Sequence, residues 1–215
     1  MDRMLSALPF LGDGLLVTLA VSSLVIVISL IVGLLLGLVI VYGPKLAYWP
    51  IRLYSDVIRG IPILVLIFTV YYGLPVLGVP IGNFAAGVLA LSLFKTAHVI
   101  EIARGALQSV GEGQMDAGKS IGLRFGQRML YVVLPQAMRR FLPPWINAVT
   151  DTVKGSALIS LVGVVDLMLA IQQVIGRTYE PMPLYVLGAL IYLAINYTLS
   201  SLSRVLEARY AYIRE

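Results

Sequence analysis

Polar side chains recur at every third position of an otherwise apolar stretch, at Ser92, Lys95, His98, Glu101 and Arg104. Steps of three residues along a helix drift by about −60° each, so these side chains form a slowly winding stripe. Lys95 and His98 favour anionic groups and Glu101 favours cationic ones, so the stripe could hold both charged ends of a small molecule. Alternatively, Lys95, His98 and Glu101 could relay protons.

The same side chains also have structural interpretations. Lys95 could be neutralised by an acid on a neighbouring helix, and His98 could hydrogen-bond to Glu101. Glu101 could in turn pair with Arg104, because side chains three apart on a helix are neighbours. We expect no metal site, since the chain has one histidine and no cysteine.

A second polar set lies further along the chain, after two consecutive prolines. It contains Asn147, Asp151 and Lys154, with Asp166 deeper in the same apolar segment. Asp151 and Lys154 could neutralise each other across one helical turn, or the set could line a polar path between helices; the role of Asp166 stays open. The candidate substrate-binding residues are therefore Lys95, His98, Glu101, Asn147 and Asp151.

A phosphate-binding pattern occurs between these two sets. Gly113, Gly118, Lys119 and Ser120 satisfy G-x-x-x-x-G-K-[ST]. In a working site this loop joins a β-strand to a helix, whereas residues 101–110 continue an apolar helix. The longest soluble piece, of about 40 residues, is too short for the parallel sheet that such a site needs. We therefore predict no nucleotide site and no catalytic residues in this chain.

Composition shows where these groups must lie. The chain has 59% hydrophobic and 13% charged residues and a mean hydropathy of +0.92, whereas soluble domains carry about 25% charged residues. We predict an all-α integral membrane protein, because a spanning helix needs roughly 20 apolar residues and five segments approach that length. They are Leu15–Val41, Ile61–Leu77, Asn83–Ala103, Trp145–Ile175 and Leu184–Leu202.

Lysine and arginine predict the orientation of these spans. Of the 16 basic residues, 12 fall in the connectors at 45–59 and 104–140 and in the segment after residue 203. The positive-inside rule places them in the cytoplasm, so the N-terminus lies outside, the C-terminus lies inside, and the number of spans is odd. The net charge of +5 follows from this placement and does not suggest binding to nucleic acid.

The cytoplasmic connector resembles a known family. From residue 116 the chain is similar to the E-A-A-x3-G-x9-I-x-L-P signature of permease subunits of binding-protein-dependent ABC importers, with Asp for Glu, Gly for Ala and Val for Ile. The matching positions are Asp116, Ala117, Gly118, Gly122, Val132, Leu134 and Pro135.

Other segments resemble the polar amino acid branch of that family. They are G-L-L-V-T-L at 14–19, R-G-I-P at 59–62, Y-Y-G-L-P at 71–75 and E-I-A-R-G at 101–105. Lys95 and His98 depart from the pattern, because the family more often has uncharged or acidic, then aromatic, residues there. The likeness covers roughly residues 12–210.

The resemblance implies a single transmembrane permease domain over 1–215, of the type I importer kind, in the bacterial inner membrane. Its coupling region would span about 105–142, and the helix at 116–127 would dock into an ATPase subunit. The coupling residues would be Asp116, Ala117, Gly118, Gly122 and Leu123.

The resemblance also implies partners: an ATPase dimer that holds ATP and Mg²⁺, a second identical or related permease, an extracytoplasmic binding protein and an amino acid substrate. This chain would carry no cofactor and would not itself be an enzyme. A proton-coupled secondary transporter or channel is the alternative.

The physical properties of the connector agree with a docking role. Asp116 near the start of a short helix would complement its positive end, and the small Ala117 and Gly118 would let a partner come close. Gly122 could take the left-handed conformation that ends a helix, and Pro135 suits the first turn of the next one. An ordinary basic loop lying against anionic lipid is the alternative.

Overall fold

The computed structural model describes residues 7–210, which form helices joined by short turns, with no β-strand in that range. The elements are α2 (Leu8–Tyr42), α3 (Lys45–Gly60), α4 (Ile63–Val76), α5 (Asn83–Gln108), α6 (Glu112–Ser120), α7 (Phe125–Arg128), the π-helix η1 (Met129–Val133), α8 (Leu134–Gly155), the 3₁₀-helix η2 (Ser156–Val162), α9 (Leu167–Thr178) and α10 (Pro181–Tyr210).

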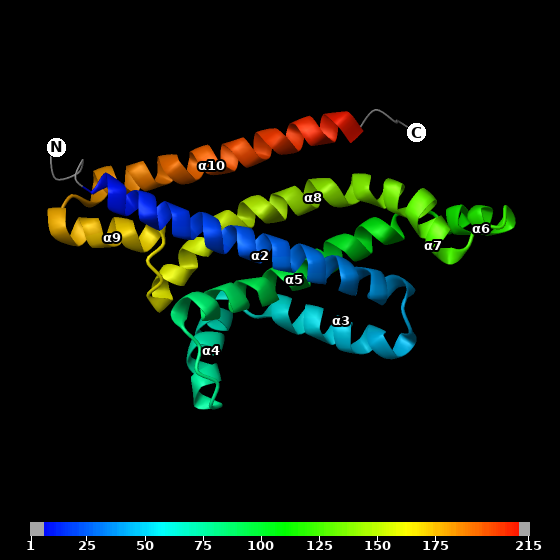
Figure 1. Ribbon diagram of the computed structural model, residues 1–215, viewed down its shortest axis with the longest axis horizontal. Coiled ribbons are helices and arrows are strands. Elements are labelled where there is room, and N and C mark those ends of the chain that lie inside the picture. The colour runs from blue at the N-terminus through cyan, green and yellow to red at the C-terminus, as the bar shows by residue number, and fades with distance from the viewer. Residues whose placement is uncertain (1–6, 211–215) are drawn as a thin grey trace.

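The molecule is elongated, and its long helices follow the long axis (Figure 1). Helices α2, α5 and α10 run in one direction, α8 and α9 return in the other, and α4 points away from the long axis. As a result, α2 begins at one end of the molecule and α10 finishes toward the other end.

Three helices are long and apolar enough to cross a membrane, namely Leu8–Tyr42, Asn83–Gln108 and Pro181–Ser201. Two helix pairs would also qualify if each counts as one span: α3 with α4, bent by 106°, and the Phe125–Val162 segment with α9, bent by 52°. The described chain therefore has three to five candidate spans.

The second predicted span, Ile61–Leu77, corresponds to a short helix that follows another helix at a sharp bend. Helix α4 has only 14 residues, and the basic residues before it lie in helix α3 and not in an irregular connector. The helices separate at Pro62, which has φ −56° and ψ 132°, because proline disfavours helical geometry in the residue before it. Helix α3 packs against α5, which could not be predicted from the length of the apolar segment.

The fourth expected span is also broken. Gly163 has a left-handed backbone with φ of 80°, which ends the 3₁₀-helix at low conformational cost. Asp166 caps the start of helix α9, and its Oδ1 accepts a hydrogen bond from the Leu169 N–H at 3.0 Å. The Leu167 N–H donates to Thr18 Oγ1 at 3.0 Å, which joins the start of α9 to α2.

Two glycines allow α2 and α5 to pack closely. A Cβ added at Gly33 would lie 2.5 Å from Val99 Cγ1, and one at Gly37 would lie 2.6 Å from the Ala103 Cβ. Both distances are far below ordinary contact, so larger residues at these positions would force the helices apart. Small residues four apart on a helix allow this kind of close helix contact.

Candidate functional site

One polar cavity contains all five candidate substrate-binding residues. It has a volume of about 440 Å³ and lies between α3, α5 and α8. Its lining residues are Arg59, Lys95, His98, Glu101, Ile102, Pro144, Asn147, Ala148 and Asp151. The two polar sets predicted from the sequence therefore face each other across this cavity, with Arg59 added from a third helix.

Lys95 and Asp151 form an ion pair across the cavity, from α5 to α8. The Lys95 side chain is 5% exposed and that of Asp151 is 65% exposed. Of the two partners considered for Asp151, the structure pairs it with Lys95 on α5 and not with Lys154, whose side chain is exposed. The interpretation that an acid on a neighbouring helix neutralises Lys95 is confirmed.

His98 bonds to its own helix. Its Nδ1 lies 2.9 Å from the Phe94 carbonyl oxygen, and because a carbonyl only accepts, Nδ1 must carry a proton. The expected hydrogen bond to Glu101 is therefore replaced by one to the backbone. A proton relay through Lys95, His98 and Glu101 is not supported, since the first two have partners outside that series.

Glu101 is the centre of an arginine cluster. Its Oε2 accepts from Arg104 Nη2 at 2.6 Å and Nε at 3.0 Å, which confirms the expected pair. Arg52 Nη1 lies 3.3 Å from Oε1 and Arg59 Nη1 lies 3.5 Å from Oε2, and the Ser55 hydroxyl donates to Oε1 at 3.3 Å. The contacts from α3 were not predicted, although the R-G-I-P motif that contains Arg59 offered a signal.

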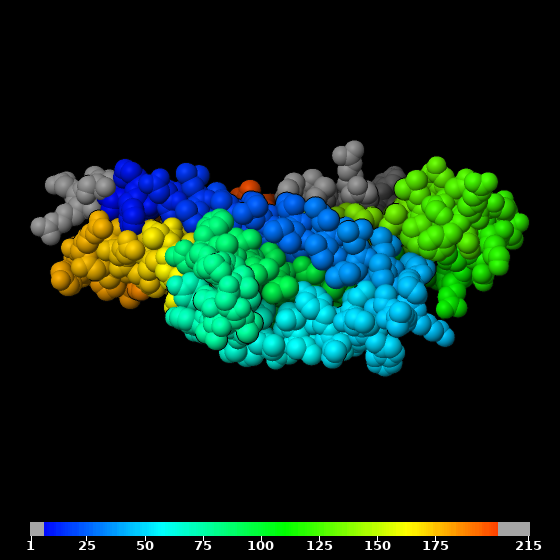
Figure 2. Space-filling view, turned by 60° about the horizontal axis from the view of Figure 1, so that its bottom comes forward, coloured from blue at the N-terminus to red at the C-terminus, as the bar shows by residue number. Residues whose placement is uncertain are grey.

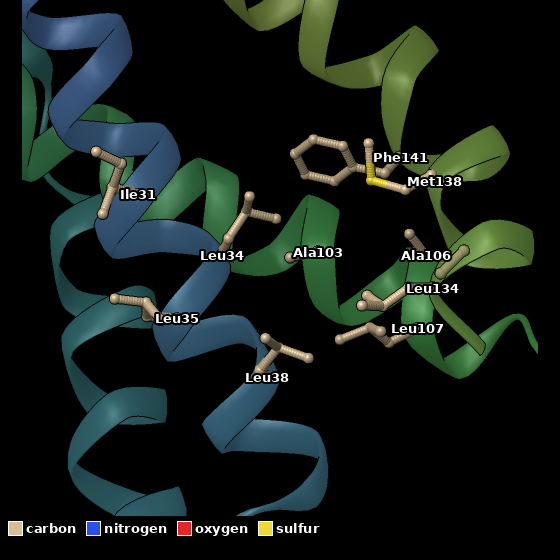
Figure 3. A pocket seen from close by; sticks show the side chains of 11 residues that line it. Ile31, Leu34, Leu35, Leu38, Ala103, Ala106, Leu107, Leu134, Met138 and Phe141 are labelled. Carbon is tan, nitrogen blue, oxygen red and sulfur yellow. The ribbon is translucent and has the colours of Figure 1, made fainter. Parts of the chain in front are cut away.

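A second cavity contrasts with the first. It has a volume of about 450 Å³ and lies between α2, α5 and α8. Figure 3 shows that all its lining side chains are apolar. They offer no charged or hydrogen-bonding group to a polar solute, so the Lys95–Asp151 cavity is the candidate site for one.

The expected coupling region lies at one end of the molecule, where α6 and α7 form a lobe (Figure 2). Helix α6 begins at Glu112, so Asp116 lies mid-helix and the prediction that it complements the helix start is wrong; Glu112 is the acidic residue of the first turn. Gly122 has φ of 82°, which confirms the predicted left-handed turn. Pro135 is in the first turn of α8, as predicted.

The small residues of α6 face different surroundings. Asp116 and Ala117 are exposed, but Gly118 is buried. A Cβ at Gly118 would lie 2.9 Å from Arg128 Cγ and 3.7 Å from Leu123 Cδ1. Gly118 therefore allows close packing within the chain itself, and the surface open to a partner is that of Asp116 and Ala117.

The phosphate-loop pattern lies in helix α6 and not in a loop after a strand. Gly113, Gly118, Lys119 and Ser120 all belong to this helix, and helix α5 precedes it. The Ser120 hydroxyl donates to the Ala117 carbonyl at 2.8 Å. The backbone amides that would wrap a phosphate in such a loop are instead within a helix, and residues 101–108 before it belong to helix α5, as predicted.

The comparison with protein families agrees with this geometry. Residues 29–212 match the family described as "Binding-protein-dependent transport system inner membrane component". The chain belongs to this family. It is therefore the inner membrane component of a transport system, as the resemblance of the connector implied.

Other permeases align along nearly the whole chain. A probable amino-acid ABC transporter permease of Bacillus subtilis is 34% identical over 208 residues, which cover 97% of this chain and 92% of the relative. The glutamine transport system permease of Escherichia coli is 34% identical over 205 residues, 94% of each chain.

Solved structures extend the likeness to the fold. A crystal structure of an amino acid ABC transporter with histidines aligns with a TM-score of 0.88 and 34% identity, covering 96% of each chain. The methionine ABC transporter in an inward-facing conformation gives a TM-score of 0.73 at 20% identity, covering 91% of this chain and 95% of the other. The second likeness concerns the fold alone.

Proposed function

We propose that this family member is the membrane-spanning subunit of an ATP-driven importer of polar amino acids. The observation that carries the proposal is the polar cavity, which gathers Lys95, His98, Glu101, Asn147 and Asp151 between helices of an otherwise apolar protein. Charged groups inside a membrane are costly and mark substrate paths, and the ends of an amino acid match the two signs of charge present. The named relatives transport amino acids or glutamine.

The proposed topology has five spans within one permease domain over 1–215, with each bent pair crossing the membrane once. An odd number of crossings agrees with α2 starting and α10 finishing toward opposite ends of the molecule (Figure 1). The basic residues of α3, of 104–140 and of the segment after residue 203 would then lie toward the cytoplasm, with the N-terminus outside.

The region 105–142 is proposed to transmit force from a separate ATPase dimer. Asp116 and Ala117 would contact the ATPase directly, whereas Gly118, Gly122 and Leu123 would shape the turn that presents them. ATP and Mg²⁺ would bind to the ATPase, and this chain would hold no cofactor. A second permease, identical or related, and an extracytoplasmic binding protein would complete the assembly.

A transport assay tests this proposal. The permease, its ATPase and its binding protein would be reconstituted in vesicles and supplied with radiolabelled L-glutamine. We expect uptake that requires both ATP and the binding protein, and no uptake by the permease alone under an imposed proton gradient. Uptake driven by the gradient without the ATPase would refute the proposal in favour of the secondary transporter.

A further inference from the structure

Among the described residues in and around the polar cavity, four cationic side chains share three carboxylates. Arg52 Nε lies 2.8 Å from Asp56 Oδ2, Arg104 Nη2 lies 2.6 Å from Glu101 Oε2, and Lys95 pairs with Asp151. Each of these three cations has a carboxylate of its own at close range. Among the described residues, Arg59, the fourth cation of the group, reaches only Glu101, the carboxylate that Arg104 holds at closer range.

Arg59 reaches only a carboxylate that is already used. Its Nη1 lies 3.5 Å from Glu101 Oε2, beyond the usual range of a charge-assisted hydrogen bond. That oxygen already accepts two N–H groups from Arg104. A carboxylate has about four acceptor positions, and Arg52 and Ser55 approach the other oxygen of Glu101, so little capacity is left for Arg59.

The guanidinium of Arg59 is on the wall of the cavity. The Arg59 side chain is 38% exposed, so its guanidinium is accessible from the cavity, and a cation that shares its counter-ion with other cations attracts a further anion. A guanidinium also binds a carboxylate with two parallel hydrogen bonds, which makes it suited to recognise one.

We propose that Arg59 binds the substrate carboxylate and that the cavity therefore selects amino acids with zero or negative net charge over cationic ones. This inference rests on the proposed function. The α-ammonium of the substrate would lie near the exposed Asp151 carboxylate and the Asn147 amide oxygen. A second ammonium or a guanidinium on the substrate would find no further carboxylate, because Asp56 and Glu101 pair with Arg52 and Arg104. Asp151, which is 65% exposed, would already face both Lys95 and the α-ammonium.

Equilibrium binding to the complete transporter in lipid nanodiscs, without the binding protein, tests the proposal. The probes are L-glutamine, L-glutamate, L-arginine and L-glutamine methyl ester, which lacks the carboxylate charge. We expect the wild type to bind L-glutamine and L-glutamate at least tenfold more tightly than L-arginine or the ester.

Substitutions separate the role of Arg59 from general effects of charge. Arg59→Gln should weaken L-glutamine binding about tenfold or more and bring it level with the ester, whereas Arg59→Lys should keep the order of preference. Lys154→Gln removes a positive charge from α8 outside the cavity lining and should leave every affinity unchanged.

Two results would overturn the inference while leaving the proposed function intact: L-arginine or the ester binding to the wild type as tightly as L-glutamine, or Arg59→Gln binding L-glutamine like the wild type. If Arg59→Gln does not assemble, the ester comparison in the wild type and in Arg59→Lys decides. Absence of any amino acid binding, together with absence of ATP-driven uptake, would instead refute the proposed function.

Discussion

Lys95 on α5 and Asp151 on α8 form an ion pair across the polar cavity, although they are 56 positions apart in sequence. The pair is asymmetric, since the lysine is almost fully buried and the aspartate is largely exposed. Removing the aspartate should therefore change the stability of the protein by a different amount from removing the lysine.

Asp151→Asn should destabilise the protein more than Lys95→Met. The first change leaves a buried ammonium without a counter-ion, whereas the second leaves a carboxylate that water in the cavity can solvate. We expect losses in the free energy of unfolding of about 3 kcal/mol and about 1 kcal/mol respectively. Thermal unfolding in detergent measures both, and the double variant should recover part of the Asp151→Asn loss. Equal effects of the two single changes would contradict the asymmetry.

Gly33→Leu should separate α2 from α5. The added side chain would occupy the position of Val99, and overpacking of this kind costs about 1–3 kcal/mol. The yield of folded protein and its melting temperature in detergent report the loss. Gly12→Ala is the matched control on the same helix, because a Cβ there meets nothing within 4 Å. A control that destabilises as much as Gly33→Leu would argue against specific packing at Gly33.

Glu101→Gln should weaken the packing of α3 against α5 more than Arg104→Gln does. Without the Glu101 carboxylate, Arg52, Arg59 and Arg104 are left close to one another with like charges, whereas loss of Arg104 leaves two cations that still share one carboxylate. We expect a destabilisation of about 3 kcal/mol for Glu101→Gln and about half of that for Arg104→Gln. The reverse order in thermal unfolding would mean that Glu101 is not the centre of the cluster.

Ala117→Trp should uncouple the permease from its ATPase. The indole would project from the exposed face of α6 and block docking, so uptake should fall at least tenfold while insertion and folding persist. Lys119→Ala is the control, because two residues along a helix place its side chain on nearly the opposite face. ATP-driven uptake and copurification of the ATPase are the measurements. Normal uptake by Ala117→Trp would remove this face from the coupling surface.

Much of the site could be predicted from the sequence, because its members follow helical spacing. The step of three residues identified Lys95, His98 and Glu101, and positions 147 and 151 are one helical turn apart. Pairing across helices could not be predicted in the same way. Asp151 is only three positions from Lys154 and 56 positions from Lys95, and it is the packing of α8 on α5 that makes Lys95 its partner.

Helices that span a whole apolar segment could be predicted from the length of that segment. Segments that are divided by a break in the backbone could not. Helices α2, α5 and α10 follow from their apolar runs. The break at Pro62 and the left-handed Gly163 divide the other two segments, and an apolar run does not show whether it bends. The same limit hid Arg52 and Arg59, which were assigned to a connector and instead face Glu101 from α3.

The most direct test of the account is whether obstruction of the polar cavity stops transport. Asn147 is exposed on its wall, so Asn147→Trp should place an indole in the cavity without displacing the core. Met138→Trp obstructs the apolar cavity instead and is the control. In reconstituted vesicles with ATP and the binding protein, we expect Asn147→Trp to abolish L-glutamine uptake while the ATPase stays bound and active, and Met138→Trp to retain uptake. Undiminished uptake by Asn147→Trp would contradict the central claim that substrate crosses through this cavity.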